Sequence, residues 1–229
     1  MTTRRVSAGI AQDQRGVGGT ERTTLRRIPE KAVTDRAVLH AVLDAGFVAH
    51  VAVSGPEGQP FIVPVAYARD GERVLFHGST GSRLFRGLQH GAPTCLSVTL
   101  LDGMVLARST FESSMHYRSV MVLGSAVVLR GADKLAALER ITEHLLPGRW
   151  TEARHPNKKE LAATLVLALP LDETSVKISA GPPDDVPEDV HLPIWAGTVP
   201  LTEKFGQAVA APDLEFDLPV PGYVKKWKR

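Results

Sequence analysis

The chain has 229 residues, of which 43% are hydrophobic and 23% are charged, a balance that is typical of a soluble globular protein with a sizeable core. This composition excludes wholesale disorder, a coiled coil and a collagen-like fibre. The single cysteine, Cys95, cannot form an intrachain disulfide, so we expect a reducing compartment and a cytoplasmic protein.

The net charge of +2 is concentrated at the two ends of the chain. Residues 1–31 hold seven bases against three acids, and residues 224–229 add four bases. Basic ends can contact nucleic acid, but no aromatic residue interleaves the N-terminal arginines, so we expect no nucleic-acid partner. No apolar run approaches the roughly 18 residues of a membrane span, so no membrane partner is expected either.

The elements are predicted from the hydrophobic period in chain order. Residues 1–30 lack such a period, which predicts a flexible basic leader. Order is expected to begin at Thr34, which would cap a helix that Gly46 ends. The expected strands are 47–53, 60–69, 73–77, 94–101, 104–111, 118–129, 164–169 and 175–178, with hairpin turns at Asp70-Gly71 and Asp102-Gly103. Further helices are expected near 84–88, from Asp133 to Leu146, and near 158–162.

The order of these elements predicts the fold class. Antiparallel strands joined by hairpins, with helices at the edges and no βαβ alternation, favour a mainly β split or closed barrel with peripheral helices. We take residues 31–201 as one domain. Pro and acidic residues dominate from Gly181 onward, so residues 202–229 are expected to form an extended C-terminal tail.

Several common catalytic motifs are missing from the sequence. It contains no dinucleotide-binding fingerprint, no P-loop, no zinc-protease motif and no nucleophile elbow. The eight histidines show no metal-ligand spacing, so we expect no metal site. Cys95 lies in an apolar strand, where a small buried thiol is expected rather than a nucleophile.

The most informative stretch runs from Phe76 to Leu84 and reads Phe-His-Gly-Ser-Thr-Gly-Ser-Arg-Leu. A strand passes through a small hydroxyl-rich loop into the start of a helix, with Arg83 in the first turn. Free backbone N–H groups, hydroxyls and a guanidinium at one place are typical of a site for a phosphate monoester. The alternative is an ordinary helix start with a surface arginine.

Four stretches, in this order and spacing, carry a resemblance to a known family: 34–46, 60–67, 76–83 and 118–126. A fifth, 193–201, is similar to a closing segment of the same group. Together they resemble the pyridoxamine 5′-phosphate oxidase-like FMN-binding split-barrel superfamily, in particular its flavin-nucleotide-binding branch related to nitroimidazole-resistance proteins. The resemblance covers about residues 34–201.

This resemblance implies an FMN site at the interface of a homodimer, with F420 or haem as alternative ligands. The implied flavin contacts fall into three groups. Along the isoalloxazine lie Ile62, Val63, Pro64 and Val65, and beside the ring and ribityl chain lie Phe76 and His77. Around the phosphate lie Ser79, Ser82 and Arg83. Ser119 would approach the flavin from the partner subunit. His77 is the candidate catalytic residue, or else it only bonds a neighbour, and Trp195 covers the pocket or anchors the tail.

The phosphate turn departs from the family pattern at one position. Relatives commonly carry a second cation where this chain has Leu84, and Arg86 is the only nearby substitute. The implied activity is a flavin-dependent two-electron oxidation or reduction of a small-molecule substrate. The alternatives are a flavin or haem carrier without a reaction of its own, and an F420-dependent reductase.

Overall fold

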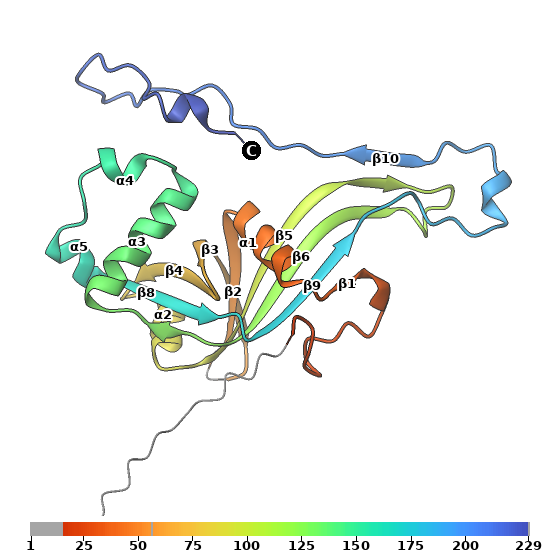
Figure 1. The fold of residues 1–229 in the computed structure, drawn as a ribbon, viewed down its shortest axis with the longest axis horizontal. Helices are drawn as coiled ribbons and strands as arrows, with labels where there is room; N and C mark the ends of the chain where they lie inside the picture. Colours follow the sequence, from red (N-terminus) through yellow and green to blue (C-terminus); the bar gives the residue numbers. More distant parts are fainter. Residues whose placement is uncertain (1–15, 56, 229) are drawn as a thin grey trace, which may run out of the picture.

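A computed structural model describes residues 16–55 and 57–228. These residues form one antiparallel sheet of ten strands in the order β1-β9-β6-β5-β2-β3-β4-β8-β7, with β10 paired to β5. The strands are β1 (Ala32–Val33), β2 (Val48–Ser54), β3 (Pro60–Asp70), β4 (Arg73–Ser79), β5 (Pro93–Leu106), β6 (Ser114–Ser125), β7 (Val127–Val128), β8 (Thr164–Pro170), β9 (Glu173–Ser179) and β10 (Gly197–Pro200). The mainly β, antiparallel split-barrel class predicted from the sequence is confirmed (Figure 1).

Five α-helices lie around this sheet in the described part of the chain: α1 (Arg36–Ala45), α2 (Arg83–Gln89), α3 (Gly131–Leu145), α4 (Arg149–Glu152) and α5 (Lys158–Ala163). Helix α1 buries Leu39, Val42 and Leu43 on one face, as its period predicts. Its first turn is capped by Asp35 rather than by Thr34, because the Asp35 carboxylate accepts a hydrogen bond from the Ala37 N–H at 2.8 Å.

The hairpin predicted at Asp102-Gly103 is wrong. The chain continues through this dipeptide as a single strand, β5, with an irregularity between Leu101 and Gly103. Asp102 points toward β6 and receives two hydrogen bonds from Arg118, at 2.7 and 2.9 Å. A Cβ on Gly103 would lie 2.7 Å from the Val199 carbonyl of β10. The glycine is therefore required by the close approach of a neighbouring strand, not by a turn.

Residues 16–33 pack on the body of the protein. Val17 is buried, and the Gly18 N–H donates to the Thr174 carbonyl at 2.7 Å. Arg22 forms an ion pair with Glu173 at the start of β9. Contacts with the sheet therefore begin well before Thr34. Residues 1–15 of the expected leader lie outside the described residues.

The interior holds two apolar clusters that lie on opposite faces of the sheet. The larger one lies inside the barrel and includes Leu43, Tyr67 and Phe76, and the Tyr67 hydroxyl donates to the Leu43 carbonyl at 2.6 Å. The smaller cluster lies between β3, β4, β8 and helix α3 and includes Leu75 and Ile141. Helix α3 thereby covers one end of the outer sheet face and leaves the rest of that face open.

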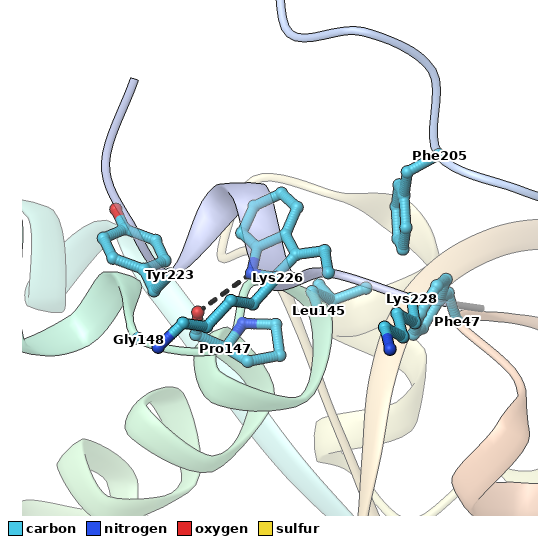
Figure 2. Close-up of a pocket in the computed structure, with 9 residues that line it drawn as sticks. Phe47, Leu145, Pro147, Gly148, Phe205, Tyr223, Lys226 and Lys228 are labelled. Atoms are coloured by element: carbon cyan, nitrogen blue, oxygen red, sulfur yellow. Dashed lines mark hydrogen bonds between the residues drawn. The ribbon is translucent and has the colours of Figure 1, made fainter. Parts of the chain in front are cut away.

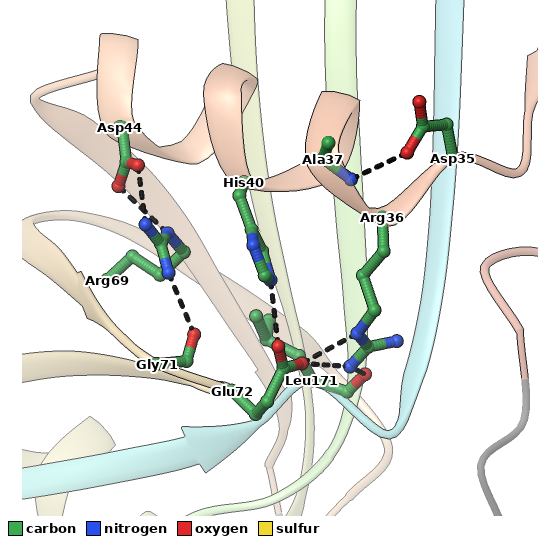
Figure 3. A network of polar contacts seen from close by, with 9 residues as sticks. All are labelled: Asp35, Arg36, Ala37, His40, Asp44, Arg69, Gly71, Glu72 and Leu171. Carbon is green, nitrogen blue, oxygen red and sulfur yellow. Dashed lines mark hydrogen bonds and ion pairs between the residues drawn. The ribbon is translucent and has the colours of Figure 1, made fainter.

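A polar network fixes α1 to the β3–β4 hairpin (Figure 3). Glu72 pairs with Arg36 and, at 3.0 Å, with His40, while Arg69 pairs with Asp44 at 2.6 Å. The hydrogen bond from Arg36 lowers the pKa of Glu72. Because each charge has a partner within the network, we assign it a structural role.

The C-terminal part follows an extended path across the molecule (Figure 1). Strand β10 lies along the second half of β5, and the chain then runs to the end of α3, where Tyr223 and Trp227 pack. None of the described helices is long and apolar enough to cross a membrane.

Candidate functional site

The first half of β3 presents an open apolar surface. Side chains alternate between the two faces of a strand, and Ile62, which is 65% exposed, and Pro64 point outward. Val63 and Val65 belong to the opposite face, and Val65 is buried in the barrel core. The predicted wall of four residues is thus divided between the two faces of β3, and of the two residues opposite Ile62 and Pro64 only Val65 is buried, since Val63 is 38% exposed.

The open surface adjoins a split in the sheet. Strands β3 and β4 pair only from Tyr67 and Phe76 to Asp70 and Arg73. Strand β4 pairs with β8 along its whole length, so beyond that point the end of β4, His77 to Ser79, keeps β8 as its only strand partner among the described residues. The first half of β3 and the end of β4 therefore diverge, and the split between them lies next to Ile62 and Pro64.

His77 lies at this split with one unsatisfied polar atom. Its Nδ1 atom is buried and has no hydrogen-bond partner among the described residues. Burial lowers the pKa of His77 below the ordinary value of 6.5, so the imidazole is neutral at pH 7. A buried ring nitrogen without a partner costs free energy unless a ligand or water supplies one, which marks His77 as a candidate ligand contact.

The turn after β4 carries the predicted phosphate residues. The Ser79 hydroxyl accepts from the Gly81 N–H at 3.1 Å, so it also shapes the turn. The Ser82 side chain makes no capping bond at the start of α2. Arg83 is exposed and its guanidinium lies 5.4 Å from the centre of the Phe61 ring, a cation–π distance.

Two cations are available at this turn. Neither Arg83 nor Arg86 pairs with a carboxylate in the described part of the chain. They are three residues apart on α2, so their side chains emerge on neighbouring parts of one helix face. Leu84 is buried with Phe85 and Leu88 in the barrel core. Arg86 is therefore the second exposed cation of this turn, at a position one turn along α2 from Arg83.

Three of the predicted residues do not join this cluster within one chain. The Phe76 side chain is fully buried, with its ring centre 6.0 Å from that of Phe85. Ser119 is half-buried on β6, three strands from β3 and hence about 14 Å away at the usual strand spacing. Trp195 is 67% exposed and packs against Gly197 at the start of β10.

Ser119 nevertheless lies on the same outward face as Pro64. Residues directly opposite one another on paired strands share a face, and the pairs Pro64–His50, His50–Ser97 and Ser97–Met121 connect β3 to β6. Ser119, two positions before Met121, belongs to this face. A second copy packed on it is the arrangement that would bring Ser119 to the site.

Sequence reasoning missed two residues near this surface: His50, and Phe61, which lies on the opposite face of β3 beside Arg83. Phe61 supports Arg83, and His50 is an exposed imidazole in the row that contains Pro64. Strict alternation along the two strands would have identified His50. Cys95 lies half-buried on the same face, and burial raises the pKa of its thiol. Among the described residues, no group of three or more His, Cys, Asp or Glu could hold a metal ion.

Comparison with known proteins gives a consistent result. The family profile described as pyridoxamine 5′-phosphate oxidase matches residues 35–178. The FAD and haem binding protein from Mycobacterium smegmatis is 44% identical over 85% of this chain and 96% of that chain, with a TM-score of 0.81. The flavocytochrome Anf3 from Azotobacter vinelandii is 37% identical over 92% of this chain and 98% of that chain, with a TM-score of 0.86.

A more distant structure supports the fold alone. A putative 5-nitroimidazole antibiotic resistance protein from Bacteroides thetaiotaomicron is 19% identical over 64% of this chain and 86% of that chain, with a TM-score of 0.53. No curated protein matches the sequence.

Proposed function

The chain belongs to the pyridoxamine 5′-phosphate oxidase family, and from this membership we propose that it binds a flavin on the outward face of β3. The observation that carries the proposal is the match, over nearly their whole length, to two structures described as a flavin and haem binding protein and a flavocytochrome. FMN and FAD both carry the phosphate that the turn at Arg83 would hold. The description of the relative at 44% identity favours FAD over FMN, and neither description favours F420.

The residues of the turn fit a phosphate ester. Arg83 and Arg86 are cations without carboxylate partners in the described chain, and the Ser82 hydroxyl is uncommitted. The Phe61 ring supports the Arg83 guanidinium on one face, which leaves its N–H groups free to donate to phosphate oxygens. The helix that follows is anchored by Leu84 and Leu88 in the core, so both arginines are presented from a fixed support.

The neighbouring surface fits the flavin ring. Ile62 and Pro64 would contact the flat ring. The unpartnered Nδ1 of the neutral His77 would form a hydrogen bond with the ligand. A bound flavin supplies reversible two-electron transfer. The chain itself would bind the phosphate, orient the ring and exclude water from one face of it.

We propose further that the site is shared by two copies of this chain and that it oxidises or reduces a small molecule. Three exposed apolar residues lie on or beside the sheet face that Ser119 occupies: Ile62, Val48 and Met104, the last of which pairs with β10. Sedimentation of the protein at micromolar concentration should give a dimer. A monomer that binds flavin with full affinity would overturn the shared site.

A second candidate function is haem binding, which the descriptions of both close relatives favour. The absorption spectrum of the purified protein tests both functions at once. Flavin bands, retained after gel filtration or restored by added FAD, support the flavin site, and a Soret band supports haem. A protein that stays colourless after incubation with FMN, FAD and haemin would contradict both.

The same preparation separates an enzyme from a carrier. Reduction of the bound flavin by a nicotinamide donor, followed by reoxidation with a small acceptor over many cycles, indicates an oxidoreductase. Binding without turnover with any donor and acceptor pair favours the carrier.

A further inference from the structure

A cavity lies apart from the flavin turn, where the C-terminal tail covers the end of α3 (Figure 2). Its volume is about 550 Å³, and its lining residues are Phe47, Leu145, Pro147, Gly148, Phe205, Tyr223, Lys226, Trp227 and Lys228. Cavities of roughly 300–1,000 Å³ are typical of small-molecule sites. Six of the nine lining residues have aromatic or aliphatic side chains, so the walls suit an apolar body.

The floor of the pocket is held in a defined shape by Glu143. Its carboxylate accepts hydrogen bonds from the Gly148 N–H at 2.7 Å and from the Trp150 N–H at 2.8 Å. Gly148 has φ +89°, and a Cβ there would lie 2.8 Å from the Tyr223 ring. Glycine at this position therefore lets the tail approach the turn closely.

The tail side of the pocket is held by the Trp227 indole. Its Nε1–H donates to the Pro147 carbonyl at 3.0 Å. The ring of Phe205 lies between those of Trp227 and Phe47, with centroid distances of 5.7 and 6.3 Å. The pocket is thus built from four separate segments of the chain: Phe47, residues 145–148, Phe205 and residues 223–228.

The rim carries two charges that the protein does not neutralise. Within the described residues, neither the Lys226 nor the Lys228 ammonium pairs with a carboxylate. The two nearby acids are already engaged, Glu143 with backbone N–H groups and Glu152 with Arg149 and the Tyr223 hydroxyl. Apolar walls beneath two unpaired ammonium groups match an anion with an apolar body.

We propose that this pocket binds a small carboxylic acid with an aromatic or aliphatic body, the carboxylate lying between Lys226 and Lys228. The lining residues include no His, Cys or Met that could ligate a haem iron, and the Tyr223 hydroxyl is bonded to Glu152. The pocket is therefore a site for an organic acid and separate from any haem.

Titration with naphthoate tests the proposal, with naphthalene methanol as the neutral analogue of the same shape. Naphthoate should bind the full-length protein, and K226Q/K228Q should weaken it about three- to tenfold, as expected for two partly exposed ion pairs. Naphthalene methanol should bind both proteins equally. The matched control K225Q removes a neighbouring exposed lysine that does not line the pocket and should leave naphthoate affinity unchanged.

Four outcomes would overturn the assignment. They are the absence of naphthoate binding, an equal loss in K225Q, an equal loss of the neutral analogue in K226Q/K228Q, and release of bound naphthoate by equimolar haemin. The variant R83A separates this site from the flavin turn, because it should leave naphthoate affinity unchanged. A loss of naphthoate affinity in R83A as large as that in K226Q/K228Q would be a fifth overturning outcome, because it would place the probe at the flavin site.

Discussion

Removal of the Arg83 side chain gives the most direct test of the flavin turn. A desolvated bidentate pair with phosphate would contribute about 1.5–3 kcal/mol. Arg83 is exposed in one chain, so solvent screening reduces a single pair to about 1 kcal/mol. We therefore expect R83A to weaken the binding of FMN and FAD roughly fivefold. Arg86, three residues later and also unpaired, remains to hold the phosphate in this variant.

The double variant R83A/R86A removes both cations. If their contributions are additive, the loss is about 2 kcal/mol, or roughly thirtyfold. Neighbouring charges on one phosphate couple, so the double loss also measures how far Arg86 compensates for Arg83. The control R27A removes an exposed arginine without an ion pair in the described chain and should leave flavin affinity unchanged.

The assay is titration of flavin fluorescence with riboflavin, FMN and FAD against each variant. Riboflavin has no phosphate, so its affinity should be the same in wild type and in both variants. Equal weakening of riboflavin and FMN would refute the reasoning, because the arginines would then act on the shape of the site. A dimer that covers Arg83 would raise the loss toward the desolvated value, and sedimentation of the same samples detects that dimer.

Three further predictions concern the scaffold. Burial lowers the pKa of His77 in the folded protein, so as pH falls the unfolded chain binds a proton at this imidazole first. The free energy of unfolding should therefore decrease as pH drops below about 6.5. In urea denaturation without cofactor, H77Q should lose less stability over that range than the wild type. G148A should release the tail and speed hydrogen exchange at residues 202–228, because its Cβ would meet the Tyr223 ring, whereas G206A, which meets nothing within 4 Å, should not. F76A should lower the free energy of unfolding by about 3–5 kcal/mol, since its ring is fully buried; a smaller loss would mean that the ring does not hold the core.

The fold was predictable because apolar and polar residues alternate clearly along its strands. The outward and inward alternation along β3 is visible in the sequence, although only the structure divides Ile62 and Pro64 from Val63 and Val65. Gly103 could not be interpreted correctly, because its neighbour β10 is about a hundred residues away in sequence. The packing of Val17 was also hidden, since one apolar residue in a polar segment has no period.

For the candidate site, the sequence predicts the turn but not the assembly, and both stay predictions. The Ser82-Arg83 step carries a local chemical signature, and the structure leaves both side chains uncommitted. Ser119 would reach the site only from a second copy of the chain, and no pattern within one sequence states how two copies meet. The pocket at Trp227 escaped sequence reasoning for a similar reason, because its walls come from four segments that share no motif.

The motifs that would bind the flavin also hold the barrel together, and this explains why so few of their residues face the ligand. In β3, Val65 and Tyr67 fill the core while Ile62 and Pro64 face outward. In α2, Leu84 fills the core while Arg83 and Arg86 face outward. A cation at position 84 would be buried without a partner, so the second charge at this turn has to come from Arg86. Ligand affinity and stability can therefore be changed separately at the outward positions, and only together at the inward ones.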